Sequence, residues 1–193
     1  MTLRLPFALT VCGLGELAAQ GERRVSHAIS ILDPDAPVPD ELADAAALQK
    51  LELRFHDIIN ERQGMQCPRP EHIERLLGFV RLLPREAAGV HLLVHCHAGF
   101  SRSPAAAILV LASTCPHMSA AQIVEEMKRI RADAWPNLRM LEIGDTLLRR
   151  RGSLIEAARR LYKAELERKP EFADLLRDFG RGREVELARR TAA

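Results

Sequence analysis

The stretch LLVHCHAGFSRSPAAAILVL, residues 92–111, places a short polar loop between two apolar runs. The first run ends at His95 and is typical of a buried strand. The second begins at Pro104 and is apolar on every side, which indicates a central buried helix. Proline suits the first turn of a helix, because its missing N–H would have no partner there. The sequence therefore predicts a strand, a loop carrying Cys96 and Arg102, and a helix.

Segments on both sides of this unit alternate between strand-like and helix-like patterns. Strands are expected over residues 7–12, 26–32 and 51–56, and helices over residues 68–83, 119–130 and from 137 onwards, with a break near Gly152. Alternation around a buried strand predicts an α/β fold with a central, mainly parallel sheet flanked by helices. We expect a core over residues 1–150 and a helical C-terminal extension over residues 151–193, packed on the same domain or trailing from it.

Composition and charge are ordinary for a soluble globular protein of 193 residues, with 47% hydrophobic residues, 28% charged residues and a net charge of +2. The charge gives no reason to expect nucleic acid as a partner. The four cysteines show no paired spacing, which favours a reducing, cytoplasmic location. The apolar N-terminal stretch is broken by Pro6, Thr10 and Glu16, so we interpret it as a strand and not as a secretion signal. No segment approaches the roughly 20 apolar residues of a membrane span.

The loop between the central strand and helix has the chemistry of an anion site. Ligands of α/β sheets bind at the carboxyl ends of the strands, and a helix N-terminus offers free N–H groups to an anion. Gly99 allows the backbone to turn so that successive amides converge, and Arg102 can grip two phosphate oxygens. The same positive field favours the thiolate of Cys96. A thiolate beside a phosphate cradle is a nucleophile directed at phosphorus.

The loop HCHAGFSRS, residues 95–103, resembles the His-Cys, five residues, Arg-Ser/Thr loop of the cysteine-dependent protein tyrosine phosphatases. It is most similar to the dual-specificity branch, of a bacterial type. Two further segments add weaker support. VSHAISIL, residues 25–32, resembles the early strand of that branch, and RADAWPNLRML, residues 131–141, resembles its Pro-Asn segment. The tail beyond residue 150 resembles nothing that we can place.

This resemblance implies a role for each residue of the loop. Cys96 would attack phosphorus and form a cysteinyl-phosphate, Ser103 would hydrogen-bond the sulfur, and His95 would fix the loop from behind. Arg102 and the loop amides would hold the phosphoryl oxygens, where charge gathers in the transition state. The expected substrate-binding residues are His97, Ala98, Gly99, Phe100, Ser101 and Arg102.

A phosphatase of this kind also needs a general acid to protonate the leaving group. In the family it is an aspartate on a loop upstream of the cysteine, and Asp57 follows a predicted strand at the correct edge of the sheet. Asp33 and Asp35, in the loop after the second strand, and Glu61 remain alternatives. His95, Cys96 and His97 are contiguous, which is poor spacing for zinc ligands, so we expect neither a metal nor another cofactor.

The leading interpretation is therefore a phosphatase that acts on phosphotyrosine proteins, with tolerance for other phosphomonoesters. An RNA 5′-phosphatase, a phosphoinositide phosphatase or a non-catalytic phosphate-binding module are the alternatives. The arginine-rich tail interleaves acidic residues at helical spacing, so we interpret it as a solvated helical face. The sequence gives no expectation for the oligomeric state.

Overall fold

The computed structural model describes residues 5–20, 24–43, 48–84 and 89–190. In this part of the chain four parallel strands form one sheet in the order β1-β4-β2-β3. The strands are β1 (Ala8–Gly13), β2 (His27–Leu32), β3 (Gln49–Arg54) and β4 (His91–Cys96). The parallel α/β sheet predicted from the alternating pattern is confirmed.

Seven helices of seven or more residues follow or separate the strands in the described chain. They are α2 (Pro70–Arg81), α3 (Arg102–Thr114), α4 (Ala120–Ile130), α5 (Leu138–Leu147), α6 (Ser153–Arg168), α7 (Phe172–Asp178) and α8 (Gly182–Arg189). Shorter turns are η1 (Leu14–Glu16), η2 (Ala18–Gln20) and α1 (Asp40–Ala43). No described helix is long and apolar enough to cross a membrane.

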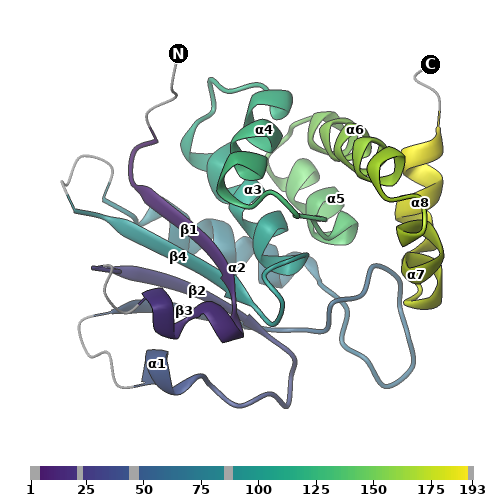
Figure 1. Cartoon of the computed structure of the whole chain (residues 1–193). Coiled ribbons are helices and arrows are strands. Elements are labelled where there is room, and N and C mark those ends of the chain that lie inside the picture. Colours follow the sequence, from purple (N-terminus) through teal and green to yellow (C-terminus); the bar gives the residue numbers. More distant parts are fainter. Residues whose placement is uncertain (1–4, 21–23, 44–47, 85–88, 191–193) are drawn as a thin grey trace.

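The helices cover the sheet unequally. Helix α3 packs on β4 and β1, and α2, α4 and α5 pack around α3, so the large helices gather beside the sheet (Figure 1). Their side chains form one continuous core with one face of the strands. In the described chain the opposite face carries a small apolar cluster of Cys12, Leu17, Ala28 and Leu93, against which Leu14 of η1 packs.

The central helix is buried because its sequence leaves no polar face. Every residue of α3 from Arg102 to Ala112 is buried. Three consecutive alanines, residues 105–107, let its backbone approach the sheet closely, since they add little side-chain bulk. The loop that carries Cys96 therefore leads into the most completely buried helix of the described chain.

The helical stretch after Pro136 is divided between α5 and α6, as expected from Gly152. This glycine has a φ of 82°, in the left-handed region that favours glycine. Asp145, at the end of α5, accepts hydrogen bonds from the backbone N–H groups of Gly152 and Leu154, at 2.6 and 2.9 Å. The carboxylate thus satisfies free donors at the start of α6. Buried side chains of α6, α7 and α8 join the same core as α3.

Parallel pairing brings the carboxyl ends of all four strands to one edge. Gly13 of β1 lies opposite Cys96, and Leu32 of β2 lies opposite Arg54 of β3. The segments that follow β2 and β3, which carry Asp33 and Asp57, therefore begin at the edge where Cys96 ends β4.

Candidate active site

The loop between β4 and α3 closes tightly against the end of β1. Gly99 has a φ of 67°, and a Cβ on it would lie 2.5 Å from the backbone nitrogen of Gly13. A Cβ on Gly13 would in turn lie 2.8 Å from backbone atoms of His97 and Ala98. Only glycine fits at either position. The sequence predicted a requirement for glycine at position 99. The requirement at position 13 follows from the pairing of β1 with β4, which the sequence did not predict.

Cys96 lies at the base of this loop and is buried. Its Sγ is 3.2 Å from the Oγ of Ser103, on the first turn of α3. The Ser103 hydroxyl also lies 3.4 Å from the carbonyl oxygen of Cys12, to which it can donate. Burial raises the pKa of the Cys12 thiol to about 12, so that side chain stays protonated at neutral pH. The pair of Cys96 and Ser103 predicted from the motif is present as a contact.

The guanidinium of Arg102 is buried at the loop's other end. Its Nη1 donates to the Oδ1 of Asp33 and to the carbonyl oxygen of Phe55, each at 2.6 Å. Its Nε is buried and has no hydrogen-bond partner among the described residues. A buried donor without a partner is costly, and an oxyanion bound in the loop would satisfy it.

The four candidate acids occupy different surroundings. Both carboxyl oxygens of Asp33 contact the loop of Cys96. Oδ1 accepts a hydrogen bond from Arg102, and Oδ2 lies 3.4 Å from the Nδ1 of His97. Asp35 is exposed. Glu61 pairs with Arg139 at 2.8 Å on the surface. Asp33 therefore acts as a partner of Arg102 in this structure, a position that the sequence did not distinguish from that of an acid.

Asp57 lies against the loop in a different way. Its Oδ1 accepts hydrogen bonds from the Oγ of Ser101 at 2.7 Å and the Nδ2 of Asn137 at 2.9 Å. No described residue donates to its Oδ2. One carboxyl oxygen is thus fixed, and the other is free to hold or accept a proton. Asn137 belongs to the Pro-Asn segment that the sequence analysis singled out, and it links that segment to Asp57.

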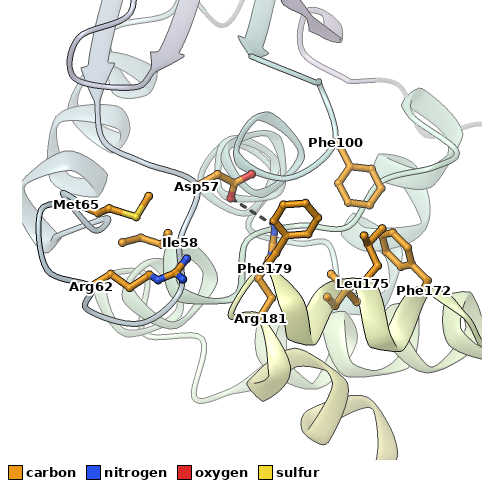
Figure 2. Close-up of a pocket in the computed structure, with 10 residues that line it drawn as sticks. Asp57, Ile58, Arg62, Met65, Phe100, Phe172, Leu175, Phe179 and Arg181 are labelled. Carbon is orange, nitrogen blue, oxygen red and sulfur yellow. Dashed lines mark hydrogen bonds and ion pairs between the residues drawn. The ribbon is translucent and has the colours of Figure 1, made fainter.

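The structure adds an arginine that the sequence analysis missed. The Nη1 of Arg181, between α7 and α8, donates to the Oγ of Ser101 at 2.8 Å and lies 3.5 Å from the Oδ1 of Asp57. Figure 2 shows Arg181 reaching Asp57 from the C-terminal segment. The interpretation of the arginine-rich tail as a solvated face is wrong at this position, because Arg181 is buried.

A buried carboxylate holds Arg181 in place. Glu184 accepts from the Nε and Nη2 of Arg181 at 2.8 and 2.7 Å, and from the Nε1 of Trp135 at 2.7 Å. Burial alone would lower the pKa of Arg181, but the charges of Glu184 and Asp57 raise it above its ordinary value. In the sequence, Arg181 and Glu184 are three residues apart, like the surface pair Asp174 and Arg177, so no sequence signal marked this pair as buried.

His95 has a buried and neutral ring. It is fully buried, and neither ring nitrogen has a hydrogen-bond partner among the described residues. Burial lowers the pKa of His95 to about 4. The imidazole, at the end of β4 directly before Cys96, is therefore uncharged near neutral pH. No three His, Cys, Asp or Glu side chains of the described chain gather closely enough to hold a metal ion.

Known structures share this arrangement of strands and helices. Human DUSP28 superposes with a TM-score of 0.54 at 19% identity, covering 74% of this chain and 94% of DUSP28. A mouse putative dual specificity phosphatase, solved as a complex with zinc tungstate, gives 0.55 at 19% identity, covering 82% of this chain and 94% of that one. The Yvh1 phosphatase domain of Chaetomium thermophilum gives 0.53 at 20% identity, covering 80% and 96%. This chain has the fold of the dual-specificity phosphatases.

Sequence comparison adds nothing to that result, since family models and curated proteins give no match. The three phosphatase structures are covered almost completely, whereas 18% to 26% of this chain lies outside the superposition. The phosphatase fold confirms the setting expected for the loop of Cys96, between a buried strand and a buried helix.

Proposed function

We propose that this chain is a cysteine phosphatase that hydrolyses phosphate monoesters through a cysteinyl-phosphate. One observation carries the proposal. Cys96 and Arg102 lie at the two ends of one tight loop, with an unpaired donor on Arg102 and with Asp57 hydrogen-bonded to Ser101 of the same loop. The expected nucleophile and oxyanion donor thus belong to the loop between β4 and α3, and the expected acid belongs to the segment after β3, which starts from the same edge of the sheet.

In the first step the Sγ of Cys96 attacks phosphorus, a P–S bond forms and the P–O bond to the leaving group breaks. Loop amides and Arg102 stabilise the charge on the equatorial oxygens. The leaving oxygen takes the proton of Asp57. Because donors occupy Oδ1, the proton of the neutral acid resides on Oδ2, and that atom delivers it.

In the second step water attacks the phosphoryl group and the P–S bond breaks. Asp57, now a carboxylate, accepts the proton of the attacking water through Oδ2. The sulfur leaves as a thiolate, and the Ser103 hydroxyl at 3.2 Å donates a hydrogen bond to it. Inorganic phosphate then leaves the loop, and the enzyme returns to its starting state.

Arg181 acts as a positioning residue in this scheme. It donates to Ser101, which donates to Asp57, so it keeps the Ser101 proton directed at Oδ1. Arg181 reaches Asp57 through the Ser101 hydroxyl, which both accepts and donates, and directly through its Nη1, 3.5 Å from Oδ1. Arg181 touches neither the sulfur nor the phosphate site, and its effect on rate would pass through Asp57.

Phosphotyrosine in proteins is the substrate class that we favour, with dual specificity as an extension. RNA 5′-ends and phosphoinositides share the phosphate group and differ in the leaving group. The loop holds no lysine, a residue that phosphoinositide phosphatases often carry there. The cytoplasmic location also remains a prediction.

The proposal is tested by turnover of p-nitrophenyl phosphate and of a phosphotyrosine peptide by the full chain. We expect both to be hydrolysed, and Cys96→Ser to abolish both reactions. Release of phosphate by Cys96→Ser at the wild-type rate would refute the mechanism. Binding of phosphate monoesters without any turnover by the wild-type chain would assign it as a phosphate-binding module instead.

A further inference from the structure

A pocket of about 480 Å³ lies beside the catalytic loop. Three segments build it: the loop after β3, Phe100 of the catalytic loop, and the C-terminal segment 172–181, which comprises α7 and the turn after it (Figure 2). In Figure 2 the side chains of Phe172, Leu175 and Phe179 approach from the C-terminal segment, with Ile58 and Met65 on the other side. The pocket therefore exists only because the C-terminal segment packs against the phosphatase core.

The pocket borders the candidate active site, with which it shares two residues. Asp57 and Phe100 line it, and both belong to the candidate active site. In-line displacement puts the leaving oxygen opposite the sulfur and within reach of the acid. The rest of the substrate is attached to that oxygen and must extend from the loop past Asp57. It therefore enters or borders this pocket.

The lining is apolar and partly uncovered. Leu175 is 46% exposed and Phe179 is 63% exposed, two of the few large apolar side chains with such exposure in the described chain. Phe100 and Phe172 meet edge to face with ring centroids 5.6 Å apart. An apolar group placed between these side chains would remove their surface from water, which is favourable.

Few polar atoms remain for a polar ligand. Asp57 and Arg181 are bonded to Ser101, and Arg181 also to Glu184. Arg62 is the remaining charged residue of the lining. An inositol ring or a ribose would lose water from several hydroxyl groups here and find few partners.

The size of the pocket exceeds that of one aromatic ring. A dry apolar cavity of roughly 150 Å³ is enough to hold benzene. The phenol ring of a phosphotyrosine would therefore leave most of the volume unfilled. A large apolar side chain next to the phosphotyrosine in the same peptide would fill the rest.

We propose that this pocket is a specificity site for a bulky apolar residue, aromatic or branched aliphatic, adjacent to phosphotyrosine in a protein substrate. The proposal rests on the proposed function and narrows it from phosphomonoesters to one class of phosphopeptide. It assigns the C-terminal segment a direct part in substrate selection.

The test measures phosphopeptide binding to the Cys96→Ser variant, which retains the loop but cannot turn over. Two peptides differ only in the residue next to phosphotyrosine, phenylalanine in one and glycine in the other. We expect about tenfold tighter binding of the phenylalanine peptide by fluorescence anisotropy. Adding Leu175→Ser or Phe179→Ser should reduce the preference to less than about threefold. Both side chains are exposed, so neither change opens the core.

Leu82→Ser is the matched control, because Leu82 is 82% exposed at the end of α2 and is not part of the pocket lining. It should keep the full preference. Equal binding of the two peptides, a preference that survives both pocket variants, or tighter binding of an inositol phosphate or a nucleoside 5′-phosphate would overturn the proposal.

Turnover by the wild-type chain separates the two claims. Hydrolysis of p-nitrophenyl phosphate without a peptide preference would refute the specificity site and support the phosphatase activity. A peptide preference of the Cys96→Ser variant without any turnover by the wild-type chain would refute the phosphatase activity and support the binding site.

Discussion

At the scale of single residues, the two oxygens of Asp57 have different surroundings. Ser101 and Asn137 hold Oδ1, and Oδ2 has no donor in the described structure. The sequence placed Asp57 at the correct edge of the sheet but could not separate it from Asp33, since both follow strands that end there. The difference lies in their partners, because Asp33 pairs with Arg102.

Replacing Asp57 by asparagine should therefore remove the acid and keep the geometry. We expect a loss on the order of 10²–10⁴-fold in kcat for tyrosine phosphate. The loss should be much smaller for p-nitrophenyl phosphate, whose phenolate leaves without a proton. Asp35→Asn, at an exposed position of the loop after β2, is the control and should keep both rates. An equal loss on both substrates would assign Asp57 a structural role.

Arg181→Met should reproduce this leaving-group dependence in weaker form. We expect kcat for tyrosine phosphate to fall about tenfold, on the order of one charge-assisted hydrogen bond, and kcat for p-nitrophenyl phosphate to fall less. In the Asp57→Asn background the change should have no further effect on the ratio of the two rates. Arg177→Met is the control, because Arg177 pairs with Asp174 on the surface.

The Arg181 variant leaves Glu184 buried without its cation, which destabilises the fold. The double variant Arg181→Met/Glu184→Gln removes both charges, so the effect of losing Arg181 can be measured without an unpaired buried carboxylate. If both variants lose the two rates in equal proportion, Arg181 supports the fold and does not position the acid.

At the scale of elements, local pattern determines much of the structure. Continuous apolar runs predicted β4 and α3. A helix was expected over residues 119–130, and α4 begins there with the Ser119 hydroxyl accepting a hydrogen bond from the Gln122 N–H. Strand ends were predicted less well. The third strand was expected over residues 51–56 but spans Gln49–Arg54. Just past its end, the N–H of Phe55 still donates to the carbonyl oxygen of Leu32, while the carbonyl oxygen of Phe55 accepts from Arg102.

The strand β4 also carries a pH-dependent element. Burial lowers the pKa of His95 from 6.5 to about 4, so the folded chain keeps the ring neutral where the unfolded chain protonates it. The free energy of unfolding therefore keeps its full value above pH 6.5, where both states carry a neutral ring. It decreases as the pH falls from 6.5 toward 4, because the unfolded chain gains a proton that the folded chain does not bind. The full difference corresponds to about 3 kcal/mol of unfolding free energy.

Denaturant unfolding at pH 7.5 and pH 5 should show this loss. The His95→Gln variant, which cannot titrate, should lose less unfolding free energy between the two pH values than the wild-type chain. Other histidines titrate equally in both proteins and cancel in the comparison. Identical losses in the two proteins would show that His95 is not the responsible group.

At the scale of the whole molecule, the C-terminal segment contacts the candidate active site. Glu184 of α8 binds Trp135 and Arg181, and Arg181 binds the catalytic loop. The sequence suggested an extension that either packs on the core or trails from it, and no local pattern distinguished the two. The bonds of Arg181 and Glu184 to the core connect residues 46 to 124 positions apart in the chain. A periodicity within one helix carries no information about such distant pairs.

The packing predicts one cooperative unfolding transition for core and extension together. Trp135 is the chain's single tryptophan and touches the extension through Glu184. Thermal unfolding followed by its fluorescence and by far-UV circular dichroism should give one coincident midpoint. A chain ending at Lys169 should unfold several degrees lower, since it leaves Trp135 without its buried partner. A separate early transition, with the core's midpoint unchanged by truncation, would show an independent extension.

The central claim is that Cys96 carries the phosphoryl group between the two steps. The direct measurement is rapid acid quench of Asp57→Asn during turnover of p-nitrophenyl phosphate, followed by mass spectrometry of the peptide that contains Cys96. Loss of the residue that activates water should slow the second step, so the intermediate should accumulate. We expect one phosphoryl group on Cys96, and none after Cys96→Ser. Turnover with Cys96 unmodified throughout the reaction, or a phosphoryl group found on another residue, would contradict the account.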